Sequence, residues 1–111
     1  MSPLVHGDVT AAARVLLAAP FGNRRALARQ LLREATCADA HRRRTGRAHP
    51  FWGNGTLMSA ALAHRPPPEP ALDDRDYLAC LRLVIDVLLQ DGAHPAQERR
   101  ALAGPERANA A

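Results

Sequence analysis

The sequence predicts an all-α protein, a small bundle of about four helices. Apolar residues recur every three to four positions in four segments, and glycine or proline separates these segments. No segment shows the alternation of apolar and polar residues that is typical of a β-strand. A chain of 111 residues has room for one domain with a thin core, which we place at residues 1–92. Its helices are expected at approximately 9–19, 24–45, 57–64 and 74–91.

Capping residues define the expected ends of the first two helices. Asp8 is expected to be the N-cap of the first helix, and Pro20 ends it. Asn23 is expected to cap the second helix, which ends at Gly46 because glycine is favoured just after a helix C-terminus. The inner face of the second helix is predicted from its apolar spacing to comprise Leu27, Leu31, Ala35 and Ala38, flanked by Ala28 and Leu32.

The third and fourth helices are separated by the proline-rich segment "PPPEP". Thr56 is the expected N-cap of the third helix, and Asp73 that of the fourth. The fourth helix is apolar around most of its circumference and therefore has to be covered on most sides. Either copies of the chain associate through this helix, or it lies at the centre of a monomeric bundle. We take one stripe as the candidate homo-oligomer interface: Leu78, Leu81, Val84, Ile85 and Leu88.

Composition limits the cellular setting and the partners. The chain has 15 basic residues, all arginine, and 11 acidic ones, so a net charge of +4 favours acidic partners such as nucleic acid. No apolar run approaches the roughly 18 residues of a membrane span, and no secretory leader begins the sequence. We therefore expect a cytoplasmic protein without a membrane partner. Residues 93–111 are expected to form a flexible tail, with a possible short helix at 96–103.

The segment "RRRTGRAHPFWGNGT", residues 42–56, is the strongest candidate for a binding site. Its arginines are expected to surround the end of the second helix, where positive charge also offsets the helix dipole. Arginines in such a cluster can contact nucleic-acid phosphates without reading the base sequence. Two further arginines lie on the outward face of the same helix. The candidate nucleic-acid-binding residues are Arg42, Arg43, Arg44, Arg47, Arg25 and Arg29.

Trp52 is interpreted as a structural anchor that fixes the loop onto the core, since tryptophan is highly buried on average. An alternative is an anion site, in which backbone amides after Gly55 and nearby arginines hold a phosphate group. The two interpretations are compatible, because the loop can be fixed from inside while the arginines remain outside.

Catalytic and metal chemistry find little support in the residue pattern. The glycines around Asn54 match neither a dinucleotide fingerprint nor a phosphate loop, and no catalytic triad stands out. A metal site would have to combine Cys37 and His41 with His49 and Cys80, a spacing unlike known zinc modules. We expect no enzyme activity, no metal and no cofactor. The first two helices form at most a weak helix-turn-helix pattern, because the second is too long for a separate reading helix.

Three segments carry a resemblance to a known family: "LVHGDVTAAARVLLAAP", "RRRTGRAHPFWGNGTLMSAAL" and "EPALDDRDYLACLRLVIDVLL". Over approximately residues 4–90 the chain resembles the small terminase subunit-like proteins of alphaproteobacterial, Rhodobacter-type gene transfer agents. The resemblance implies a phage-like DNA-packaging adaptor that forms rings, binds DNA weakly and non-specifically, and engages a large terminase motor. The alternative is a small helical adaptor or regulator of other proteins that never contacts nucleic acid.

Overall fold

The computed structural model describes residues 1–91, and this part of the chain is an all-helical bundle, as predicted. Outside its helices, an isolated bridge between His49 and Gly53 is the one β-type pairing in this part. The predicted domain boundary at residue 92 and the expected tail at 93–111, with its short helix at 96–103, lie outside the described residues. The helices are α1 (His6–Leu17), a 3-10 turn η1 (Phe21–Asn23), α2 (Arg24–Thr45), α3 (Leu57–Leu62) and α4 (Arg75–Asp91).

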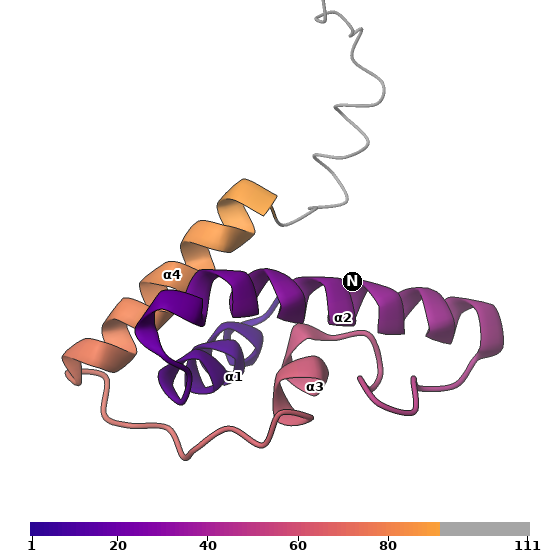
Figure 1. The fold of residues 1–111 in the computed structure, drawn as a ribbon. Helices are drawn as coiled ribbons and strands as arrows, with labels where there is room; N and C mark the ends of the chain where they lie inside the picture. The colour runs from indigo at the N-terminus through magenta and orange to yellow at the C-terminus, as the bar shows by residue number, and fades with distance from the viewer. Residues whose placement is uncertain (92–111) are drawn as a thin grey trace, which may run out of the picture.

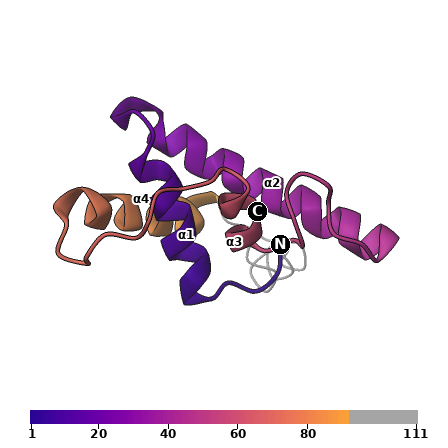
Figure 2. The same cartoon turned by 90° about the horizontal axis from the view of Figure 1, so that it is seen from below.

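The longest helix, α2, runs along the molecule and organises the other three (Figure 1). α1 packs against both α3 and α4, and α2 contacts all of them. Seen from below, α1 and α3 lie side by side across α2, while the chain after α2 folds back along its last turns (Figure 2). The second half of α2 therefore extends beyond the place where α1 and α4 meet.

The first helix differs from its predicted bounds because Asp8 caps it from inside. Oδ2 of Asp8 accepts the amide of Val5 at 2.8 Å, so that the helix begins at His6 and Val5 is its N-cap residue. Asp8 Oδ1 accepts the amide of Met58 at 2.8 Å and thereby joins the N-terminus of α1 to that of α3. The N-cap prediction for Asp8 is therefore wrong. This carboxylate is buried and holds two helices together.

The other helix ends follow the sequence more closely. Gly46 takes a φ of 75° after α2, and its amide bonds the carbonyl of Arg42 at 2.7 Å. Thr56 caps α3 by accepting the amide of Ser59 at 3.0 Å, although α3 ends at Leu62 rather than at residue 64. At the start of α4, Asp74 accepts the amide of Tyr77 at 2.9 Å, a role that we had expected of Asp73.

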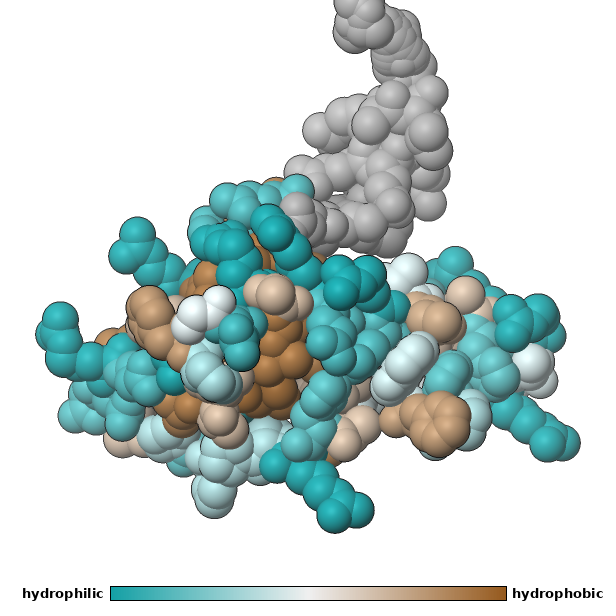
Figure 3. Space-filling view, in the orientation of Figure 1, coloured by the Kyte–Doolittle hydropathy of each residue, from teal (hydrophilic) through white to brown (hydrophobic). Residues whose placement is uncertain are grey.

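The core forms where α1, α3 and α4 meet the first half of α2. Many of its members are alanines, which lets the helix backbones approach closely, and the predicted inner face of α2 is confirmed apart from a half-buried Leu27. In Figure 3, apolar surface gathers around α1 and α4, and hydrophilic residues cover most of the far end of α2. The large side chains with almost no exposed surface are Tyr77, Leu16, Leu31, Leu57 and Val87. No helix within residues 1–91 is long and apolar enough to cross a membrane.

Candidate nucleic-acid interface

Four arginines lie exposed at the C-terminal end of α2, and we call Arg42, Arg43, Arg44 and Arg47 the arginine end. The last turn of α2 positions the first three. Gly46 adopts a left-handed conformation and ends the helix, so the chain changes direction there. Arg47 is the first residue after this turn. Arg42 donates to the carbonyl of Asn54 at 3.3 Å, a long bond that leaves most of the guanidinium available to a ligand.

Few opposing charges offset the arginine end. Arg43 lies 3.0 Å from the carboxylate of Asp39, yet its own side chain is 74% exposed. Asp39 is buried and also lies 3.1 Å from the amino group of Met1. Between positions 40 and 68 the sequence contains five arginines and no acidic residue. The surface is therefore strongly positive, and an anion would meet little competition from carboxylates.

A tight turn, residues 49–53, follows the arginine end. The backbone of His49 and that of Gly53 exchange two hydrogen bonds, of 2.7 and 3.2 Å. Nδ1 of His49 accepts the backbone amides of both Phe51 and Trp52, at 3.1 and 3.2 Å. Because Nδ1 is the acceptor here, the neutral ring carries its proton on Nε2. Two consecutive backbone amides of this short turn are thus held by a single imidazole.

Aromatic packing reinforces this turn. The indole of Trp52 stacks on His49 with ring centroids 4.6 Å apart and an interplanar angle of 9°. His41, from the last turns of α2, meets the same imidazole edge-on at 5.1 Å. Trp52 is therefore half-buried against the turn and α2, and it is not a member of the apolar core. It holds the turn through His49 rather than by filling the core.

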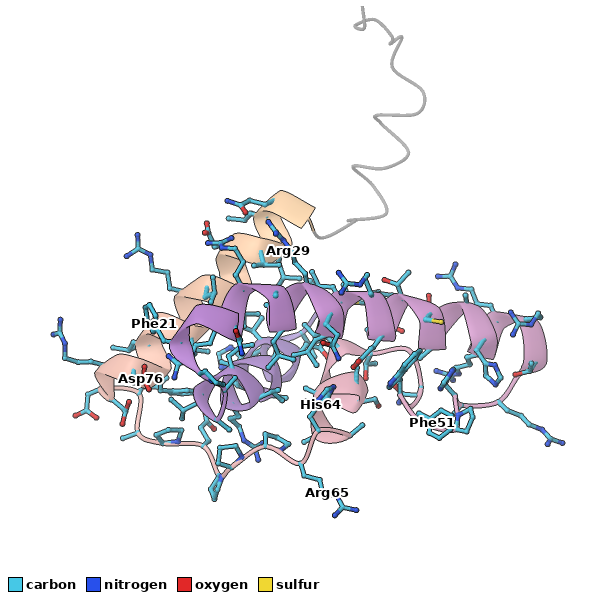
Figure 4. The ribbon with its side chains drawn as sticks, viewed as in Figure 1. Phe21, Arg29, Phe51, His64, Arg65 and Asp76 are labelled. Carbon is cyan, nitrogen blue, oxygen red and sulfur yellow. The ribbon has the colours of Figure 1, made fainter. Side chains whose placement is uncertain are left out.

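The neighbouring aromatic residue, Phe51, is 74% exposed and was missed by the sequence reasoning. Figure 4 shows Phe51 beneath the last turns of α2, at the opposite end of the helix from Phe21. The sequence feature that could have indicated an exposed ring is the pair of consecutive aromatic residues, Phe51 and Trp52. In so short a turn only one of two consecutive aromatic rings can stack on His49, so the other is left in solvent.

Gly55 fixes the loop against α2. Its φ is 99°, and a Cβ at this position would lie 2.8 Å from the Cα of Asp39. Only glycine allows this close approach of two backbones. The carbonyl of Gly55 also accepts the amide of Ser2 at 3.1 Å. The limb of the loop that follows Phe51 is therefore held against both α2 and the N-terminal segment.

Arg25 and Arg29 are not part of the arginine end. Arg25 donates to Asp86 at 3.1 Å and to Gln90 at 3.0 Å, both on α4. It ties α2 to α4, so its predicted role as a nucleic-acid contact would have to compete with this ion pair. Arg29 lies exposed one turn further along α2. At 1.5 Å per residue, Arg25 lies roughly 25 Å along the helix from Arg42.

Arg24, which the sequence reasoning did not single out, is buried at the first turn of α2. Its guanidinium donates twice to Asp76, at 2.8 and 3.2 Å, and also bonds the carbonyls of Leu17 and Ala19. The hydrogen bond from Arg24 lowers the pKa of the Asp76 carboxyl below its ordinary value. The ring of Phe21 lies over this guanidinium, 5.6 Å from centroid to Cζ. At this end of α2 each nitrogen of the Arg24 guanidinium is therefore used in contacts within the protein.

The predicted interface stripe on α4 is divided by the fold. Val84 is 3% exposed and belongs to the core of the protomer, while Leu81 and Leu88 are half-buried. The helix is rotated so that Tyr77, Cys80, Val84 and Val87 face inward, which leaves Leu78 and Ile85 outside. Leu89, which was not in the stripe, is 79% exposed. We call Leu78, Ile85 and Leu89 the outer α4 face.

The four residues considered for a metal are not brought together. Cys37 is exposed on α2 and Cys80 is buried on α4, whereas His41 and His49 are in contact. No three histidine, cysteine or acidic side chains within residues 1–91 converge as metal ligands would. A further histidine contact is structural in character, because His64 bonds the buried Glu34 at 2.8 Å and so ties the turn after α3 to α2.

Comparison with known proteins gives one match. Residues 2–88 match the model of a family described as a domain of unknown function (DUF7742). Neither the curated proteins nor the solved structures give a match.

Proposed function

We propose that this chain, which belongs to the DUF7742 family, is a non-catalytic, small terminase-like adaptor for DNA packaging in a phage-like gene transfer agent. In this proposal several copies associate, bind DNA weakly and non-specifically, and hand it to a large terminase motor. The observation that carries the proposal is the arginine end, four exposed guanidinium groups in a stretch of chain without a carboxylate.

The arginine end suits a backbone contact rather than base readout. Guanidinium groups bind phosphate oxygens in forked pairs, and such contacts carry no sequence information. Four phosphate contacts per copy would make the logarithm of the binding constant fall with the logarithm of salt concentration with a slope of about 3 to 4. Binding by one copy is then weak at physiological salt.

Self-association would multiply this weak contact. The outer α4 face presents three large apolar side chains that remain between 45% and 79% exposed within residues 1–91. Burying them between copies is favourable by the hydrophobic effect, and it would place several arginine ends on one assembly. Linked weak sites bind a polyanion far more tightly than separate ones. The resemblance to ring-forming packaging adaptors supports the same arrangement.

The test compares two triple variants of equal charge in duplex DNA binding. Arg42→Ala/Arg43→Ala/Arg44→Ala removes three charges from the arginine end, whereas Arg33→Ala/Arg75→Ala/Arg82→Ala removes three exposed arginines elsewhere. We expect the first variant to lose at least about tenfold in affinity at low salt and the second to change much less. Light scattering on both checks that they assemble alike. Equal affinity of the two variants would refute the proposal.

The oligomer is tested by its mass. Wild-type protein should be larger than a monomer at micromolar concentration, and Leu78→Glu/Ile85→Glu should shift it toward the monomer, because charge on the outer α4 face opposes apolar burial. Val84 is unsuitable for this test, since it lies in the core. A monomeric wild-type protein would remove the assembly from the proposal.

A protein-binding adaptor without nucleic-acid contact is the second candidate. It is favoured by the outer α4 face together with Phe21, which is 82% exposed nearby in η1. Salt distinguishes the two functions. An arginine–phosphate complex weakens steeply between low and physiological salt, whereas an apolar helical contact hardly responds.

A further inference from the structure

We propose that the arginine end includes a stacking site for an unpaired nucleobase, with Phe51 as its platform, so that the protein prefers single-stranded segments to duplex. The inference deepens the proposed function and rests on it, since the same arginines hold the phosphates. Contact with a duplex backbone needs charge alone, because the bases are stacked inside. An exposed aromatic ring among arginines is instead the combination that binds unpaired bases.

The turn holds Phe51 outward. Its backbone amide donates to the His49 ring, and the indole of Trp52 occupies a face of that ring. The ring centroids of Phe51 and His49 are 5.8 Å apart, and the rings are tilted by 53°. The phenyl ring therefore contacts the imidazole without being buried by it. A phenyl ring with 74% of the residue exposed is thus fixed before any ligand arrives. Pre-organisation of this kind reduces the entropy lost on binding.

Positive charge lies within reach of that ring. Arg47 lies four positions before Phe51, so their Cα atoms are at most about 14 Å apart. Arg42 bonds the backbone of Asn54 on the other limb of the loop. A nucleotide stacked on Phe51 would therefore have guanidinium groups near its flanking phosphates. The chain supplies no acidic residue between positions 40 and 68 to repel them.

The opposite end of α2 provides a matched comparison. Phe21 is as exposed as Phe51, but the guanidinium of Arg24 lies against its ring. The α2 arginines beside Phe21, Arg24 and Arg25, are engaged by Asp76 and Asp86, while Arg82 of α4 lines a pocket with Phe21 and stays exposed. Exposure of an aromatic ring is therefore common to both ends. The α2 arginines next to Phe21 are paired with carboxylates of α4, whereas within residues 1–91 no carboxylate of another helix pairs with the exposed arginines of the arginine end.

The experiment measures fluorescence anisotropy with a labelled 20-nucleotide oligo-dT and a labelled 20-base-pair duplex. Wild type should bind the single strand more tightly than the duplex. Phe51→Ala should weaken single-strand binding roughly 5- to 100-fold, as expected for one lost base–aromatic stack, and change duplex binding less than about twofold. Phe51→Tyr should retain the preference, Phe51→Leu should lose it, and Phe21→Ala should match wild type. Trp52, the chain's single tryptophan, should change its emission with oligo-dT.

The outcomes separate the two proposals. If Phe51→Ala leaves single-strand binding unchanged, or weakens both nucleic acids equally, the stacking site is refuted, while arginine-dependent duplex binding still supports the proposed function. If oligo-dT binds through Phe51 but the duplex does not bind at low salt, the stacking site is supported and the packaging function is refuted. If neither nucleic acid binds, both proposals fail.

Discussion

The two ends of α2 carry similar residues and differ in what faces them. At the N-terminal end, Arg24 and Arg25 lie near an exposed phenylalanine, and both donate to carboxylates of α4. At the C-terminal end, Arg43 and Arg44 lie exposed in the last turn of α2, the end beneath which Figure 4 shows the exposed Phe51, and within residues 1–91 neither pairs with a carboxylate of another helix. The comparison teaches that residue type alone does not decide the role of an arginine. A carboxylate presented by a neighbouring helix makes it structural, and its absence leaves it for a ligand.

The geometry of the bundle explains the difference. α4 crosses only the first half of α2, so its acidic residues Asp76 and Asp86 reach only that half (Figure 1). The second half of α2 is supported by the loop at 46–56, which has no acidic residue. We therefore expect changes at the first end to alter stability and changes at the second to alter binding.

The largest effect should follow from removing the buried arginine. Arg24→Ala leaves the carbonyls of Leu17 and Ala19 without their donor. It also removes the two hydrogen bonds to the Asp76 carboxylate. We expect a loss of about 3 kcal/mol in the free energy of unfolding, because two part-buried backbone carbonyls lose their charged donor. Urea unfolding measures it. An unchanged midpoint and slope would show that this end is not held by its ion pair.

The next effect tests the support of the other end. Gly55→Ala forces a Cβ against the backbone of Asp39 at a φ of 99°, and we expect a destabilisation of about 2 kcal/mol. Gly46→Ala is the control, since its φ of 75° is also left-handed but the space beside it is open, and about 1 kcal/mol is expected. If the two variants are equally stable, the close approach at Gly55 contributes nothing.

Most of the fold was predictable because it depends on local signals. Helical spacing of apolar residues located all four helices, and Gly46 and Thr56 marked two of their ends. The start of α1 was not predictable from a cap rule. Asp8 acts from the third helical position, and it is buried because it also bonds Met58 across fifty residues. A contact of that range is not encoded in the neighbouring sequence.

The candidate site was predictable only in part, for the same reason. The arginines of the segment at 42–56 are a local cluster and their exposure follows from the helix end. Arg25 resembled them in sequence, and its pairing with Asp86 depends on how α2 crosses α4. The roles of Phe51 and Trp52 depend on which ring stacks on His49, which the turn decides.

A third prediction concerns the buried phenol of Tyr77, which lies on α4 near the N-terminal end of α2. Burial, together with the hydrogen bond to Glu69, raises the pKa of Tyr77 to about 12. The folded state thus favours the protonated phenol, whose stabilising contribution is full below pH 10 and is lost as the pH rises toward 12. Tyr77→Phe should lose about 1 kcal/mol at pH 8 and show a shallower decline at high pH than wild type. Cys80, whose pKa burial also raises, is present in both proteins and cancels in the comparison.

The substitutions with the smallest expected effect on stability should differ most clearly between the two ends of α2 in DNA binding. Arg25 and Arg43 each make one ion pair through a solvent-accessible guanidinium, Arg25 with the half-exposed Asp86 at 3.1 Å and Arg43 with the buried Asp39 at 3.0 Å. Exposed pairs contribute little, so Arg25→Ala and Arg43→Ala should each cost less than about 1 kcal/mol in urea unfolding. In duplex DNA binding at low salt, however, Arg43→Ala should weaken the complex several-fold and lower its salt slope by about 1, while Arg25→Ala should leave both unchanged. Equal effects of the two substitutions on DNA binding would mean that a carboxylate presented by a neighbouring helix does not decide which arginines meet the ligand.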